Sequence, residues 1–124
     1  MSERIKEEVQ VVRAAIYAPE GYVTDEHLER DLYRFSVRLT GLSVKESHRD
    51  IFVRAVLDAI AAICRLNGYS PSSVSTDPSA DQDIVHVNIC GVPAGTIHFI
   101  TTRREDPFRA IRHFLRKGGD DERQ

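Results

Sequence analysis

The segment from Ile51 to Leu66 constrains the fold of this chain most, because nearly every position in it is apolar or small. Its charged members are Arg54, Asp58 and Arg65, at spacings of 4 and 7 residues. On a helix these spacings form one narrow polar stripe, so the segment is expected to be a helix covered on several sides. With 124 residues and 41% hydrophobic content, the chain has enough apolar material for one domain built around this helix.

Two further helices are expected before this central one. The first is predicted from about Glu3 to Tyr17, because apolar residues recur at spacings of 4, 3 and 4 along Ile5, Val9, Val12 and Ile16. The second is predicted from an N-cap at Thr24 to a stop at Gly41, with an apolar line of Leu28, Leu32, Phe35 and Leu39. A capping box over residues 43–46 is expected to start the central helix, which ends at Asn67 and Gly68.

The second half of the chain carries the β signals. Residues 83–90 and 96–102 alternate between apolar and polar side chains and predict a hairpin whose loop runs from Gly91 to Gly95. Residues 73–76 could add an edge strand. The Asp106-Pro107 pair predicts the start of a last helix, whose buried line would be Phe108, Ile111 and Leu115.

These elements predict an α+β fold within one domain over residues 1–117, followed by a flexible acidic tail over residues 118–124. Three N-terminal helices, the central one buried, would precede a small antiparallel sheet of two to three strands and a C-terminal helix. If Gly91 pairs with Gly95, Asn88 lies opposite His98, and His86 is one diagonal step away on the same face.

Charge and composition narrow the classes of function. The net charge of −2 offers no global attraction to nucleic acid or to a membrane. The longest apolar stretch is interrupted by charges, and the N-terminus opens without an apolar signal stretch, so a cytoplasmic protein is expected. Cys64 and Cys90 are expected to be reduced thiols in that compartment, although a disulfide between them is not excluded.

The two histidines of the hairpin are the candidates for chemistry. His86, Asn88 and His98 on one face could take part in a metal or general-base site. The sequence supplies only two imidazole ligands there, and it contains neither a phosphate-binding loop nor a dinucleotide fingerprint. We therefore expect no metal, no cofactor and no catalytic residues, and an enzyme is the third hypothesis for function.

Arginines near the last helix are the strongest binding candidates. They are Arg103 and Arg104 before its predicted start, and Arg109, Arg112 and Arg116 at helical spacing along it. The predicted order α-β-β-β-α over the last seventy or so residues resembles that of double-stranded RNA-binding domains, in which a basic start of the final helix contacts phosphates. The resemblance implies RNA binding through these arginines, which is the second hypothesis. The sequence departs from that family at Glu105 and Asp106, where acids stand at the phosphate-binding position.

The first hypothesis is a small, non-enzymatic protein-interaction module, such as an adaptor, a regulator or an inhibitor of a larger partner. It is favoured by the lack of a catalytic motif and by the abundance of arginine, whose planar head group suits protein interfaces. The partner would be another protein, and a second copy of the chain could also fill that role. The arginine-rich last helix could equally be an ordinary solvated face.

Overall fold

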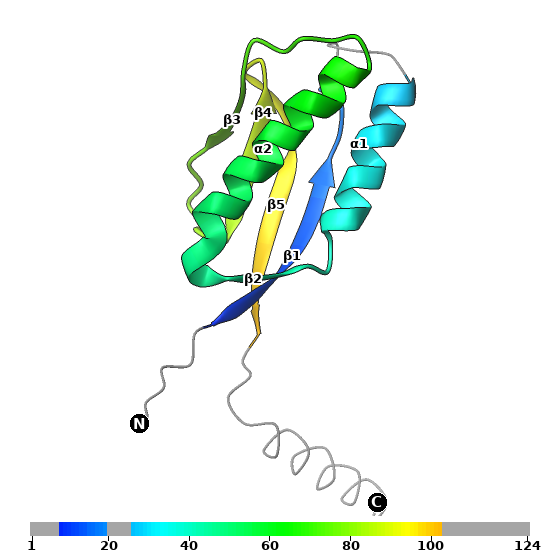
Figure 1. The fold of residues 1–124 in the computed structure, drawn as a ribbon. Coiled ribbons are helices and arrows are strands. Elements are labelled where there is room, and N and C mark those ends of the chain that lie inside the picture. Colours follow the sequence, from blue (N-terminus) through cyan, green and yellow to red (C-terminus); the bar gives the residue numbers. More distant parts are fainter. Residues whose placement is uncertain (1–7, 20–25, 103–124) are drawn as a thin grey trace, which may run out of the picture.

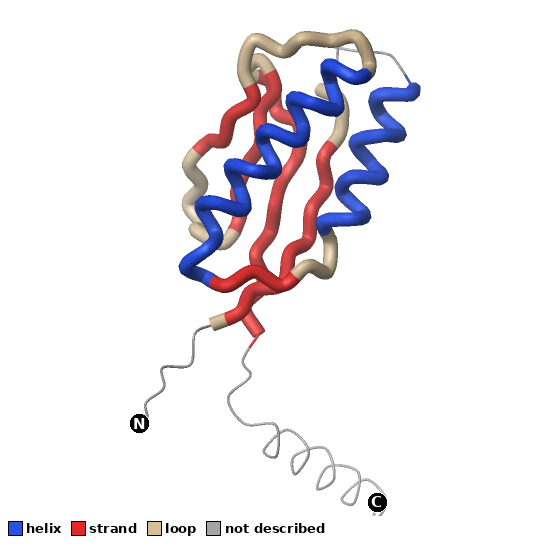
Figure 2. The backbone as a smooth tube through the Cα atoms, in the orientation of Figure 1, coloured by secondary structure: helices blue, strands red, loops and turns tan. Residues whose placement is uncertain are grey.

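The computed structural model describes residues 8–19 and 26–102, which form a five-stranded antiparallel sheet with two helices on one of its faces (Figure 1). The strands lie in the order β2-β1-β5-β4-β3. Figure 2 shows the two layers, with the helices in blue and the strands in red. In chain order the elements are β1 (Val9–Ile16), α1 (Glu26–Leu39), β2 (Ser43–Lys45), the 3₁₀ turn η1 (Glu46–His48), α2 (Arg49–Leu66), β3 (Val74–Asp77), β4 (Ile84–Ile89) and β5 (Val92–Thr102).

The predicted arrangement of three N-terminal helices before a sheet of two to three strands is wrong. Where the first helix was expected, the chain forms β1, which pairs with β5 along its whole length. The apolar spacing of 4, 3 and 4 is compatible with a helix, but β-branched residues fill half of this segment and favour a strand. Alternate side chains of β1 face the helices, namely Gln10, Val12, Ala14 and Ile16, and the polar Gln10 hides that alternation in the sequence.

The second expected helix is present as α1, and Gly41 follows it with a φ of +99°. The predicted capping box is wrong, because Ser43 to Lys45 form the edge strand β2 and pair with residues 9–11 of β1. The central helix α2 is also less enclosed than expected. Its fully buried residues lie on one face, while Ile51 is 71% exposed on the other.

The hairpin of β4 and β5 is tighter than the sequence predicts. Its turn consists of Cys90 and Gly91, with φ values of +53° and +77°, as in the two-residue turns that match the twist of a hairpin. Because β5 therefore begins at Val92, Asn88 lies opposite Pro93 and not opposite His98. The expected edge strand is present as β3, and the predicted last helix lies outside the described residues.

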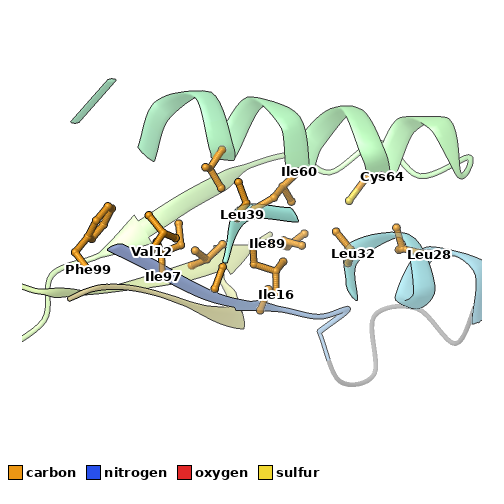
Figure 3. Packing of buried hydrophobic residues seen from close by; sticks show 14 of the residues in the cluster. Val12, Ile16, Leu28, Leu32, Leu39, Ile60, Cys64, Ile89, Ile97 and Phe99 are labelled. Carbon is orange, nitrogen blue, oxygen red and sulfur yellow. The ribbon is translucent and has the colours of Figure 1, made fainter. Parts of the chain in front are cut away.

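The core lies between the sheet and the two helices (Figure 3). Leu28 and Leu32 of α1 and Ile60 and Cys64 of α2 are fully buried above the sheet. The largest buried side chain is Phe99 of β5. The strand residues that meet the helices are Val12, Ile16, Val87, Ile89, Ile97 and Phe99.

Arg49, at the start of α2, connects that helix to the sheet. Its guanidinium group lies 4.4 Å from the centre of the Phe99 ring, and its Nη1 atom lies 3.3 Å from Oδ1 of Asp83. The same side chain donates to the carbonyl oxygen of Gln82. Phe52 meets the Phe99 ring edge-on, with 6.0 Å between the ring centres. A stacked, half-enclosed arginine thus holds the loop before β4 against α2.

Gly95 marks the closest approach of β5 to β1. It has a φ of +134°, and a Cβ atom there would collide with the carbonyl oxygen of Ala15 and lie 2.8 Å from the Cα atom of Ile16. Since those are backbone atoms of a paired strand, they cannot move without disturbing the sheet. Only glycine fits this position.

We expect Gly95→Ala to lower the free energy of unfolding by about 2–4 kcal/mol, because it combines a backbone clash with an unfavourable φ. Gly68→Ala is the matched control, since Gly68 also has a positive φ (+86°) but open space around it. Urea unfolding of both variants measures the difference. Equal losses in the two variants would show that the contact with β1 is not tight.

Candidate functional site at the junction of α1 and β1

The arginine cluster predicted to bind a partner lies outside the described residues. It comprises Arg103, Arg104, Arg109, Arg112 and Arg116. Its role therefore stays a prediction. Within the described part of the chain, a different basic stripe is present, because Arg30, Arg34 and Arg38 recur at every fourth position of α1 and are exposed.

His86 and His98 lie on the face of the sheet opposite the helices, as neighbours on β4 and β5. His86 is opposite Thr96 and His98 is opposite Ile84, so the two imidazoles are diagonal neighbours on one face. Asn88 is only 6% exposed, and the corrected register separates it from His98. No group of three or more His, Cys, Asp or Glu residues suited to a metal ion occurs in the described ranges.

The two cysteines carry thiols and are not joined by a disulfide. Cys64 is buried in the core beneath α2, and Cys90 lies in the hairpin turn. Burial raises the pKa of the Cys64 thiol, and the nearby Cys90 raises it further, while Arg65 lowers it. A thiol whose pKa is raised stays protonated at neutral pH, so Cys64 is a poor nucleophile and serves as part of the core.

The outer edge of β1 has an unusual set of hydrogen-bond partners. Beyond its short pairing with β2, the backbone N–H groups of Ala14 and Ile16 donate to side-chain hydroxyls at the end of α1. The distances are 3.0 Å from Ala14 N to Thr40 Oγ1 and 2.8 Å from Ile16 N to Ser36 Oγ. Helix hydroxyls thus take the place of a neighbouring strand along this part of the edge.

Each of these hydroxyls also donates its own proton to the helix. Ser36 Oγ lies 2.9 Å from the carbonyl oxygen of Leu32, and Thr40 Oγ1 lies 2.9 Å from that of Ser36. A hydroxyl has one proton to donate and can accept at the same time, so each bridges a strand N–H and a helix carbonyl. These bridges hold α1 directly against the edge of the sheet.

An apolar groove of about 620 Å³ follows this junction on the outer side of α1. Three large side chains are exposed along it: Tyr33 (66%), Val37 (54%) and Tyr17 (49%). Among the described residues that line the groove, Glu29 is the only charged one. A groove of this size, mostly apolar with a few polar groups, is typical of a binding site.

A second hollow of about 570 Å³ lies beside α2 and is more polar. Arg49, Asp50 and Arg54 line it, together with Glu46 and Gln82. Arg49 is already engaged with Asp83, with Gln82 and with the Phe99 ring. The groove at α1 and β1 is therefore the stronger candidate, because Tyr17, Tyr33 and Val37 leave about half or more of their surfaces exposed along it.

Sequence reasoning did not find this groove. Tyr17 was assigned to the end of a helix, and Tyr33 and Val37 were not singled out on the second helix. The sequence holds one indication of the contact between helix and strand. Ser36 and Thr40 are hydroxyl residues four positions apart near the end of an amphipathic helix. That signal indicates hydrogen bonding to a neighbouring backbone only when the neighbour is known to be a strand edge.

Comparison of the chain with models of protein families, with curated proteins and with solved structures gives no match. A helix long and apolar enough to span a membrane is not found in the described part of the chain.

Replacing the hydroxyl that accepts from β1 tests the junction. We expect Ser36→Ala to lower the free energy of unfolding by about 1–3 kcal/mol, because the buried N–H of Ile16 loses its acceptor. Ser43→Ala, at an exposed position of β2, is the control and should change stability by less than about 0.5 kcal/mol. The comparison is made by urea unfolding, and similar stability of the two variants would contradict the assignment.

Proposed function

We propose that this protein is a non-enzymatic protein-interaction module that binds an apolar segment of a partner protein in the groove between α1 and β1. The observation that carries the proposal is the exposure of Tyr17, Tyr33 and Val37 side by side along one groove. Exposed apolar residues scattered singly need no explanation, but a cluster that includes two tyrosines is typical of an interface.

The way in which the partner binds follows from the edge of β1. A peptide that added a strand here would need the backbone N–H groups of Ala14 and Ile16, which already donate to Thr40 and Ser36. The partner therefore binds through its side chains. An apolar or aromatic anchor, such as those on one face of an amphipathic helix, would fill the groove.

The chemistry of the groove favours binding over catalysis. The Ser36 hydroxyl accepts from Ile16 and donates within α1, so it is not available as a nucleophile. Glu29 is the single carboxylate among the described lining residues, and no histidine or cysteine lies beside it there. An acid–base pair would need a second titratable group within hydrogen-bond reach. The cytoplasm is the proposed location, where the thiols of Cys64 and Cys90 stay reduced.

Affinity capture with matched variants tests the proposal. The tagged full chain is used to capture partners from host lysate in parallel with Val37→Asp and Leu66→Asp, with and without nuclease. Val37→Asp places a charge in the groove and should reduce capture of a discrete protein by about tenfold or more. Leu66→Asp is the control, because Leu66 is 85% exposed at the end of α2, away from the groove.

Both variants are first compared with the parent chain by thermal unfolding, since only folded variants are informative. A protein that survives nuclease and is captured equally by all three chains would contradict the groove as its site. Recovery of nucleic acid that is lost at raised salt would favour the competing hypothesis of RNA binding through the arginines.

A further inference from the structure

The strand β3 forms one edge of the sheet, and Figure 1 shows it at the side of the sheet opposite α1. Its bonding pattern is fixed by one contact, because the N–H of Cys90 donates to the carbonyl oxygen of Ser73 at 2.8 Å. Bonded and non-bonded pairs alternate along an antiparallel ladder, so Ser75 also bonds to β4. The N–H and carbonyl groups of Val74 and Thr76 therefore point outward, away from β4.

This edge is open among the described elements. β3 pairs only with β4, and no hydrogen bond in the described ranges reaches the outward groups of Val74 or Thr76. The edge of β1, in contrast, is closed by the hydroxyls of Ser36 and Thr40. β2, at the other end of the sheet, ends on the exposed Lys45, and such charges hinder the addition of a strand. Thus β3 is the edge that remains available for a further strand.

We propose that β3 pairs antiparallel with β3 of a second copy, so that the two sheets join across a twofold axis. The edge favours one register, with Ser75 opposite Ser75 of the second copy. Val74 then lies opposite Thr76 of the second copy, and both pairs of this kind exchange N–H···O bonds. A register centred on Thr76 would place Val74 opposite Pro78, which has no N–H to donate. A register centred on Val74 would place Thr76 opposite Ser72, which lies before the strand begins.

The second hollow, beside α2, supplies side-chain contacts for this pairing. Thr76 lines it, together with the half-buried Val53 and Leu57 of α2. Residues directly opposite each other in an antiparallel pair point to the same face, so Val74 of the second copy lies on the same face as Thr76. Its methyl groups then fill part of the hollow of about 570 Å³. Each copy thus contributes one apolar side chain to the other, as a twofold interface requires.

The same register suits the face of the sheet that lies away from the helices. Ser75 meets its own copy there, and two small hydroxyl side chains fit side by side. Asp77 lies opposite Ser73 of the second copy, so no carboxylate of β3 lies opposite another. Both faces of the edge therefore match a second copy, which favours it over an unrelated extended segment. This surface is separate from the groove of α1 and β1, and the proposal does not rest on the proposed function.

Sedimentation equilibrium of the full chain measures the association. We expect a dimer with a dissociation constant on the order of 0.1 mM, because an edge of this length buries little surface. Thr76→Pro removes an outward N–H and leaves the bonds to β4, so it should weaken the dimer by about tenfold or more. Thr76→Val keeps that N–H and is the matched control. A parent chain that stays monomeric up to about 1 mM would overturn the proposal and leave the edge to an extended segment of another protein.

A charge swap at Ser75 tests the register and does not depend on proline. Ser75→Asp and Ser75→Lys each place like charges side by side at the twofold axis, so each should weaken its own dimer by about fivefold. An equal mixture of the two variants should dimerise at least as tightly as the parent chain. Thermal unfolding first checks that each variant is folded. Dimers that tolerate both single variants, or that the mixture does not restore, would show that the copies meet elsewhere and would overturn the proposal.

Discussion

The outer edge of β1 is the constraint on which the rest of this structure depends. A strand edge presents backbone groups that must be hydrogen-bonded when they are shielded from water. β2 is too short to pair with more than the first residues of β1. In the turn after α1, the carbonyl oxygen of Leu42 accepts from the N–H of Val12, and the N–H of Gly41 donates to the carbonyl oxygen of Val12. Farther along the same edge, the hydroxyls of Thr40 and Ser36 accept from the N–H groups of Ala14 and Ile16. The helix therefore closes the edge, and its position beside the sheet follows from these bonds.

Closing the edge in this way has two consequences for binding. A foreign strand cannot pair with the second half of β1, which protects the protein against edge-to-edge association. The same contact leaves one side of α1 beside the edge, so Tyr33 and Val37 meet Tyr17 along an apolar groove. The groove thus results from the hydrogen bonds between α1 and the backbone N–H groups at the edge of β1. Hydrogen bonds from Ala14 and Ile16 to the helix hydroxyls favour binding through side chains over the addition of a strand.

The sequence predicted the elements whose pattern is strong by itself. The helix that ends before Gly41, the body of α2 and the first hairpin strand β4 agree with the prediction, because each has clear periodicity and a clear stop. β1 was misassigned because Val9, Val12 and Ile16 fit the helical spacing, while the buried Gln10 masks the alternation. The predicted register of the hairpin is also wrong, because Gly95 does not end the turn. It lies within β5, where it packs closely against the backbone of β1.

The candidate site was harder to predict than the fold. Tyr17 and Tyr33 lie on different elements and come together only because α1 packs against the edge of β1. That packing depends on hydroxyl bonds to a strand that the sequence pattern does not reveal. The arginine cluster, which the sequence predicts to be a binding site, lies outside the described residues. His86 and His98 lie on one face of the sheet, but their neighbours depend on a register that is set by a two-residue turn.

Amide hydrogen exchange at Ala14 and Ile16, read residue by residue by NMR, tests the closed edge most directly. If Thr40 and Ser36 accept from these groups, both amides should exchange on the order of a thousandfold or more slowly than in an unfolded chain. Exchange at Ile16 should then accelerate in Ser36→Ala, while Ala14 keeps its protection. Rapid exchange of both amides in the parent chain, at the rate of exposed loop residues, would contradict the account.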